Sequence, residues 1–264
     1  WIIGCGKCPY LKTYPELMFD RTAFLWKYKK RICEMIDFTI VVPSKWLKNK
    51  VEISFLKNKK IELIYNGIET DKYKKTNKLI ARKSLDLPID KKIILFSAAG
   101  GLSNEFKGGE YFLKLVDFFK NHDEVLFLTT GGEKEKTNLS RRIDYGYVES
   151  EEKMALLYSA ADIYLYPTLA DNCPLSVIEA MSCGLPIVTF CAGGVPEIVE
   201  HMKTGYVAEY KNSDDLKNGV EMLLKDERIR EDLSINSVNR VKEKFSSIIM
   251  SEKYFNLYKE LRGK

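Results

Sequence analysis

The sequence predicts an α/β fold in which a Rossmann-like parallel sheet carries helices on both faces. Strand and helix patterns alternate from residue 90 onward, and the strands are short and almost wholly apolar. Continuous apolar strands are typical of parallel sheets that are buried on both faces. Pairs of glycines follow three of these strands, at 100–101, 131–132 and 193–194. Because ligands bind such sheets at the carboxyl ends of the strands, these glycines indicate backbone that approaches a ligand.

The elements of this part of the chain follow from apolar spacing and from residues suited to helix starts. We expect strands at 92–97, 124–132, 162–167 and 185–190, the second of which runs into glycines. We expect helices at 109–122, 150–161, 174–183, 195–201 and 213–226. Ser150 and Ser213 are the predicted N-caps of two helices, because each precedes acidic residues that suit a first turn.

The first 70 residues form a separate α/β segment. Helix, strand, helix and strand patterns occupy 22–36, 37–43, 44–55 and 60–68. Two strands do not complete a doubly wound sheet, so residues 1–70 are predicted to be the C-terminal part of an incomplete Rossmann-like domain. Residues 71–244 form the second domain, and 67–78 is the predicted hinge. Residues 245–264 contain an amphipathic helix that needs a surface to cover.

Composition and charge exclude several classes of protein. Hydrophobic residues make up 45% of the chain and charged residues 30%, which is globular and not disordered. A net charge of +5 is too mild to indicate a nucleic-acid partner. No apolar run spans a membrane and no signal peptide is visible. The lysine-rich stretches at 27–31 and 57–60 are best explained as solvated surface; the alternative is a face for anionic lipid headgroups.

Cysteine usage indicates a cytoplasmic protein. Four of the six cysteines are scattered through helix and strand patterns, which is typical of reduced thiols. Cys5 and Cys8 form a C-x-x-C pair. A structural zinc ion needs four ligands, so the pair is interpreted as loop thiols, and zinc binding with ligands from further upstream is the alternative. The chain begins at Trp1, from which we expect a processed start or a piece of a larger protein.

The stretch DNCPLSVIEAMSCG, residues 171–184, places two carboxylates around a helix start. Pro174 suits the first helical position, which leaves Asp171 in the preceding loop and Glu179 on the flank of the buried stripe. The first-turn amides of such a helix can bind a phosphate, and a carboxylate further along can accept hydrogen bonds from a ribose diol. On spacing alone, a surface ion pair is the better explanation of Glu179.

Two glycine-rich loops are further candidate anion sites. In residues 97–110 Lys107 precedes a helix start, an arrangement that suits a diphosphate, although a solvated lysine explains it equally well. The loop matches neither G-x-x-x-x-G-K-[ST] nor G-x-G-x-x-G, which argues against NAD binding. Gly193 and Gly194 permit an anion-binding nest of amides, or form an ordinary strand-to-helix turn.

The order of the motifs closely resembles family-4 glycosyltransferases of the GT-B fold. The resemblance rests on VVPSKWL at 41–47, IYNGIETDKY at 64–73, FKGGEYFL at 106–113 and the whole of 145–207, followed by a terminal helix. The stretch GCGKCPYL, followed by TAFLWKYKK, resembles a subgroup that acts in bacterial surface polysaccharide synthesis.

This resemblance implies an activity. The C-terminal domain, 71–244, would bind a UDP- or GDP-sugar, and the N-terminal domain would contact the acceptor. The helix in 245–264 would cross back to the first domain. A hexosyl group would pass, with retention and without metal or cofactor, to a glycan or lipid-linked acceptor. The protein would be cytoplasmic or peripheral at the inner face of the membrane.

The resemblance also assigns residues. Its E-x7-E motif falls on Asp171, beside the donor sugar, and on Glu179, which would hold the ribose hydroxyls. Lys107 would neutralise the diphosphate leaving group. The backbone near Tyr147 and Val148 would face the base, and amides of Pro174 and Leu175 would lie near the phosphates. The full set of implied donor-binding residues is Gly100, Gly101, Tyr147, Val148, Asn172, Pro174, Leu175, Gly193 and Gly194.

The chain departs from the family pattern at two points. An arginine usually precedes the lysine of the glycine-rich loop, and here Gly101 or its neighbours occupy that place; either half of the leaving-group clamp is missing, or Arg141 or Arg142 substitutes. The first part of a typical N-terminal domain is also absent, so this chain is expected to bind a donor but to transfer sugar poorly. The alternative is a non-catalytic nucleotide-sugar-binding subunit that a separate chain completes.

Overall fold

The computed structural model describes residues 2–12, 16–133 and 141–263, and the chain forms two compact units, Trp1–Ile64 and Tyr65–Lys264. The first unit contains two helices and two parallel strands among its described residues. Ser44 caps the second helix, because its hydroxyl accepts a hydrogen bond from the Leu47 amide at 3.1 Å. The elements are α1 (Thr22–Met35), β1 (Thr39–Val42), α2 (Lys45–Glu52) and β2 (Lys60–Leu63).

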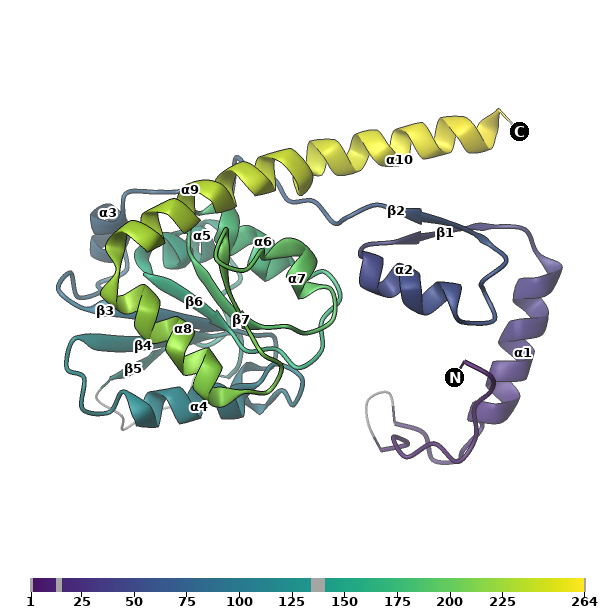
Figure 1. The fold of residues 1–264 in the computed structure, drawn as a ribbon, viewed down its shortest axis with the longest axis horizontal. Helices are drawn as coiled ribbons and strands as arrows, with labels where there is room; N and C mark the ends of the chain where they lie inside the picture. The colour runs from purple at the N-terminus through teal and green to yellow at the C-terminus, as the bar shows by residue number, and fades with distance from the viewer. Residues whose placement is uncertain (1, 13–15, 134–140, 264) are drawn as a thin grey trace. The chain divides into compact units, whose positions relative to one another are not determined.

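The second unit is built around a six-stranded sheet in the order β5-β4-β3-β6-β7-β8, with every neighbouring pair parallel (Figure 1). Its strands are β3 (Lys92–Ser97), β4 (Val125–Thr130), β5 (Arg142–Asp144), β6 (Ile163–Tyr166), β7 (Ile187–Phe190) and β8 (Gly205–Ala208). Its helices are α3 (Lys78–Ser84), η1 (Gly101–Ser103), α4 (Gly109–Phe118), α5 (Glu151–Ala160), α6 (Leu175–Ser182), α7 (Val195–Ile198), α8 (Ser213–Lys225), α9 (Glu227–Lys244) and α10 (Ser247–Arg262).

Successive residues of the central strands point to opposite faces of the sheet and build two cores. Ile93 and Leu95 of β3 pack into one core, on the side of α5 and α6. Ile94 and Phe96 pack into the other, on the side of α4 and α8. Figure 1 shows these helices on the two faces of the sheet. The predicted parallel sheet covered on both faces is therefore confirmed.

The strand order creates a switch point between β3 and β6. From β3 the chain proceeds to β4 and β5 on one side, and then crosses to β6, β7 and β8 on the other. The two central strands pair at Ile94↔Ile163 and Leu95↔Tyr164. In open parallel sheets ligands bind in the crevice outside the carboxyl ends of strands at such a point. The loops that follow β3 and β6 are therefore the first place to look for a site.

The segment predicted as a hinge, 67–78, is attached to the second unit. The Ile68 amide donates to the Phe245 carbonyl at 2.9 Å, and the Ile68 carbonyl accepts from the Ser247 amide at 2.8 Å. Further along, the Thr76 amide donates to the Ser159 hydroxyl at 3.1 Å. The segment thus packs as part of unit 2, and the two units divide at Ile64. The crossing of the terminal helix back to the first unit stays a prediction.

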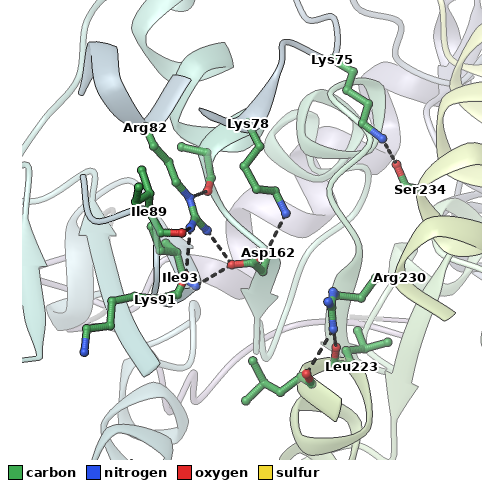
Figure 2. A network of polar contacts seen from close by, with 12 residues as sticks. Lys75, Lys78, Arg82, Ile89, Lys91, Ile93, Asp162, Leu223, Arg230 and Ser234 are labelled. Atoms are coloured by element: carbon green, nitrogen blue, oxygen red, sulfur yellow. Dashed lines mark hydrogen bonds and ion pairs between the residues drawn. The ribbon is translucent and has the colours of Figure 1, made fainter. Parts of the chain in front are cut away.

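A buried ion pair fastens α3 to the amino edge of the sheet (Figure 2). Asp162, directly before β6, accepts from the Arg82 guanidinium at 2.8 Å, the Ile93 amide at 2.7 Å and the Lys78 ammonium at 2.7 Å. Burial opposes ionisation of Asp162, but Lys78, the Ile93 amide and Arg82 outweigh it, so the pKa of this carboxyl is lowered. The Asp162 carboxylate thus contacts three residues that lie 69, 80 and 84 positions away from it in the sequence.

Of the two predicted helix N-caps, one is confirmed and the other is wrong. The Ser150 hydroxyl accepts from the Lys153 amide at 3.1 Å, which confirms its capping role. The N-cap of α8 is Asn212 instead of Ser213, because the Asn212 side chain accepts from both first-turn amides, of Asp214 and Asp215, at 3.1 Å. Within the described residues, no helix is long and apolar enough to cross a membrane.

Candidate functional site

The switch point brings together two residues singled out from the sequence. Lys107 lies in the loop between β3 and α4, and Asp171 lies in the loop between β6 and α6. Their side chains form an ion pair and are 23% and 17% exposed. The Tyr166 hydroxyl donates to Asp171 Oδ2 at 2.5 Å and accepts from Lys107 Nζ at 3.2 Å. A cation and a carboxylate thus meet at the carboxyl ends of the two central strands.

Two glycines allow the loops of this site to pack backbone against backbone. Gly108 has φ 70°, and a Cβ there would lie 1.9 Å from the Pro167 carbonyl oxygen. Gly193 has φ 56°, and a Cβ there would lie 1.9 Å from the Asp171 carbonyl oxygen. The Gly194 amide donates to that same oxygen at 3.0 Å. The proposed anion nest therefore does not include the Gly194 amide, because it is used to hold the Asp171 loop.

The glycines after β3 and β4 hold a neighbouring pair of loops. The Gly100 amide donates to the Gly131 carbonyl at 2.9 Å, and a Cβ on Gly101 would lie 2.9 Å from Gly132 Cα. Gly100 and Gly101 line a cavity of about 400 Å³. Within the described part of the chain, its other walls come from η1 and from the ends of β4 and β5, and neither Lys107 nor Asp171 lines it.

Glu179 lies on α6, half-buried, and accepts a hydrogen bond from the Tyr158 hydroxyl at 3.2 Å. Burial raises the pKa of the Glu179 carboxyl, and the hydrogen bond from Tyr158 acts in the opposite direction. Among the described residues no lysine or arginine forms an ion pair with Glu179. The explanation of Glu179 as a surface ion-pair partner is therefore wrong.

The start of α6 differs from the prediction by one position, and the difference changes its chemistry. Pro174 is the N-cap, with ψ 118°, and Leu175 is the first helical residue. Proline has no backbone N–H, so Pro174 cannot supply an amide to a phosphate. The first-turn amides of Leu175 and Ser176 are the donors that an anion could use. The side chain of Asn66 fixes the loop before them by donating to the Cys173 carbonyl at 3.3 Å.

The remaining residues predicted to contact the donor lie in the loops after β5 and β6. Tyr147 and Val148 follow β5; Tyr147 is 71% exposed, whereas Val148 packs against the core. The Asn172 amide donates to Asp171 Oδ1 at 3.0 Å and helps to orient the carboxylate.

The two candidate arginines each contact an aspartate. Arg141 pairs with Asp123 and donates to the Phe119 carbonyl at 3.1 Å, and these partners precede β4 at the amino edge of the sheet. Arg142 is buried on the outermost strand, β5, with Asp144 at 3.5 Å. The expectation that Arg141 could replace the arginine of the family pattern is therefore wrong, whereas that role for Arg142 stays a prediction.

Three tyrosines that pack against one another beside the site were not predicted from the sequence: Tyr158, Tyr164 and Tyr166. The rings of Tyr158 and Tyr164 are 5.7 Å apart, and those of Tyr164 and Tyr166 are 5.6 Å apart. A signal was present, because the run IYLY at 163–166 places tyrosines in a strand predicted to be buried. A buried phenol needs a hydrogen-bond partner, and carboxylates in the adjoining loop and helix were candidates for that partner.

A protein-family comparison matches residues 77–240 to the family "Glycosyl transferases group 1". The chain belongs to this family. It is 28% identical to an uncharacterized glycosyltransferase of Methanocaldococcus jannaschii over 96% of this chain and 70% of that protein. It is 29% identical to the N,N'-diacetylbacillosaminyl-diphospho-undecaprenol alpha-1,3-N-acetylgalactosaminyltransferase of Campylobacter jejuni over 66% of this chain and 46% of that protein.

Solved structures show the same fold. The sucrose-phosphate synthase of Thermosynechococcus elongatus superposes with a TM-score of 0.79 and 24% identity, over 92% of this chain and 63% of that one. An Anabaena protein crystallised with UDP and glucose superposes with a TM-score of 0.72 and 18% identity, over 89% of this chain and 66% of that one. The chain thus has the α/β architecture of GT-B glycosyltransferases, and it spans between about half and two thirds of most of these proteins.

Metal ligands do not gather in the described part of the chain. Across residues 2–12, 16–133 and 141–263, no group of three or more histidine, cysteine, aspartate or glutamate side chains is placed to hold an ion. Cys5 and Cys8 are free thiols at the N-terminal end of the first unit.

Proposed function

We propose that the chain is the donor-binding part of a retaining glycosyltransferase. It would use a UDP- or GDP-hexose and a glycan or lipid-linked acceptor, without metal, in cell-surface polysaccharide synthesis. The observation that supports this best is the Lys107–Asp171 pair at the β3/β6 switch point. The loops at the carboxyl ends of these strands place a cation, which suits a leaving diphosphate, in contact with a carboxylate, which suits a sugar.

Each residue has a role that its surroundings support. Lys107 can neutralise the diphosphate as the glycosidic bond breaks, and it precedes Gly108, where a larger residue would collide with the Pro167 carbonyl. Asp171 is oriented by the Tyr166 hydroxyl and the Asn172 amide, which suits a carboxylate that must accept hydrogen bonds from sugar hydroxyls. The Leu175 and Ser176 amides can receive a phosphate, and Glu179 can accept the ribose diol from the flank of α6.

The names of similar proteins support the choice of donor and acceptor. The Anabaena protein was crystallised with UDP and glucose, and the C. jejuni relative is named for a diphospho-undecaprenol acceptor. A further relative, 26% identical over 91% of this chain, is named a capsular polysaccharide glycosyltransferase of Staphylococcus aureus. Each name agrees with one part of the proposal: the donor, the lipid-linked acceptor or the polysaccharide product.

Calorimetry with UDP and GDP tests the proposal. One of the two nucleotides should bind with a Kd well below about 1 mM. Glu179→Ala should weaken that binding by about tenfold, since hydrogen bonds from a ribose diol to a charged group would be lost. Glu231→Ala, an exposed acid on α9, is the matched control and should leave the affinity unchanged. Absence of binding by both nucleotides, or equal effects of the two variants, would refute the site.

Transfer activity separates the enzyme from the non-catalytic alternative. The wild-type chain is incubated with radiolabelled UDP-sugars, GDP-sugars and bacterial lipid extract, and the labelled lipid is counted. Incorporation that Lys107→Met abolishes supports catalysis by this chain. If the chain binds the nucleotide but no acceptor fraction yields labelled lipid, the result favours a donor-binding subunit.

A further inference from the structure

The hydroxyl of Tyr166 lies between the two charged side chains of the site. It donates to Asp171 Oδ2 at 2.5 Å and accepts from Lys107 Nζ at 3.2 Å. The same ammonium lies 5.6 Å from the centre of the Tyr166 ring. The phenol therefore contacts the cation with its oxygen and the carboxylate with its proton.

Packing explains the ring but not the hydroxyl. Tyr166 is 2% exposed and its ring packs against Tyr164, a place that phenylalanine would fill equally well. The Tyr164 hydroxyl, on the same strand, donates to a backbone oxygen, of Ser97, at 3.0 Å. The Tyr166 hydroxyl contacts the Thr168 side chain and, in addition, both charged side chains of the proposed site. A buried hydroxyl costs free energy unless it is paired, so this pairing is what retains it.

The hydroxyl stays a proton donor. Burial, followed by the nearby Asp171 charge, raises the pKa of Tyr166 far above its usual value, so the phenol is neutral at any physiological pH. Asp171 therefore has two neutral donors besides Lys107: the phenol on Oδ2 and the Asn172 amide on Oδ1, the latter at 3.0 Å.

A diphosphate at this site would compete with Asp171 for Lys107. The ammonium cannot hold a leaving diphosphate and remain fully paired with the carboxylate. When Lys107 turns to the phosphate, the Asp171 carboxylate, whose side chain is 17% exposed, loses its cation, and an unpaired charge that is largely buried is costly. The two neutral donors are what remains to hold Asp171 toward the sugar.

We propose that Tyr166 is a positioning residue that holds Asp171 toward the donor sugar when Lys107 engages the diphosphate. This inference rests on the proposed donor site. It predicts that the hydroxyl matters for the sugar part of the ligand and acts through Asp171. A nucleoside diphosphate alone, which has no sugar at Asp171, should bind almost equally well without it.

The test is a double-mutant cycle in calorimetry with wild type, Tyr166→Phe, Asp171→Asn and the double variant. The ligands are UDP, GDP, UDP-glucose, UDP-N-acetylglucosamine and GDP-mannose, and the sugar nucleotide that wild type binds most tightly is used. Tyr166→Phe should weaken the sugar nucleotide by about tenfold and the matching diphosphate by less than about twofold. In the Asp171→Asn background Tyr166→Phe should have no further effect.

Tyr206→Phe is the matched control, because its hydroxyl also donates to a carboxylate, Asp215 Oδ1 at 2.6 Å, away from the site. It should leave both affinities unchanged. Equal losses for diphosphate and sugar nucleotide, additive effects in the double variant, or no loss in Tyr166→Phe would each overturn the role of Tyr166. Failure of wild type to bind any of the five ligands would instead refute the donor site itself, and with it this inference.

Discussion

The buried pair between Asp162 and Arg82 is the sharpest stability test that the structure offers (Figure 2). Asp162→Asn keeps the shape of the side chain but removes the charge opposite Arg82. Arg82 is 3% exposed and Asp162 is 4% exposed, so water cannot replace the lost partner. The amide also has only one oxygen, which cannot accept from Arg82, Lys78 and the Ile93 amide as the carboxylate does.

The expected loss of stability depends on the hydrogen bonds that Arg82 retains in the Asp162→Asn variant. Removing one member of a buried ion pair costs about 3–5 kcal/mol. Arg82 still donates to backbone carbonyls, at 2.9 Å to Ala160 and 2.9 Å to Lys91, so the low end, about 3 kcal/mol, is expected. In a unit the size of Tyr65–Lys264, 1 kcal/mol shifts Tm by about 2–4 °C, so Tm should fall by about 6–12 °C.

Thermal unfolding followed by circular dichroism measures this shift, with Lys78→Met as the control. Lys78 pairs with the same carboxylate but is 46% exposed, and such pairs contribute about 1 kcal/mol or less. Its Tm should fall by no more than about 4 °C. Similar shifts for the two variants would contradict the view that burial decides the strength of this pair.

The pH dependence of Tm independently tests whether the charged form of Asp162 stabilises the fold. The pKa of Asp162 is lowered in the folded state, so its contribution to stability is present above its unfolded pKa and is lost as pH falls through the folded value. The Tm difference between wild type and Asp162→Asn should be full at pH 7 and should shrink below about pH 4. A shift below about 2 °C at pH 7, or one that grows in acid, would refute the reasoning.

Three further changes test other parts of the structure. Gly193→Ala should destabilise by about 1–3 kcal/mol and weaken donor binding, because its Cβ meets the Asp171 carbonyl, whereas Gly4→Ala, with open space around it, should be neutral in urea unfolding. Glu179→Gln should raise Tm at pH 7, because burial raises the pKa of Glu179 and disfavours its charged form. This gain in Tm should disappear in acid, where the wild-type carboxyl is protonated. A gain that stays constant with pH would contradict this origin. Phe112→Ala should cost about 3–5 kcal/mol in urea unfolding, because Phe112 is fully buried between α4 and the sheet, and a cost below about 1 kcal/mol would show that the core collapses around the cavity.

Local patterns predicted the strands and helices that bury continuous apolar surface. The runs that became β3, β4, β6 and β7 were visible because both faces of a central strand are covered, so nearly every residue is apolar. Five elements of the described residues were not predicted: α3, η1, β5, β8 and α9. The strand β5 has only three residues at a sheet edge, and α9 is mostly polar with a few buried positions such as Leu233 and Val241. Their structure depends on neighbours more than on their own pattern.

The sequence by itself determined the parallel α/β fold, the glycine-rich loops at the strand ends, and the presence of Lys107, Asp171 and Glu179 near helix starts. These depend on residues a few positions apart. Only the tertiary structure decided that Lys107 pairs with Asp171, 64 positions away, that Tyr166 lies between them, and that Arg141 faces the other edge. The strand order sets these contacts, because it brings β3 and β6 together and separates β5 from them. A crossover connection decides which distant residues become hydrogen-bond partners, and such a pairing produces no periodic pattern in the sequence.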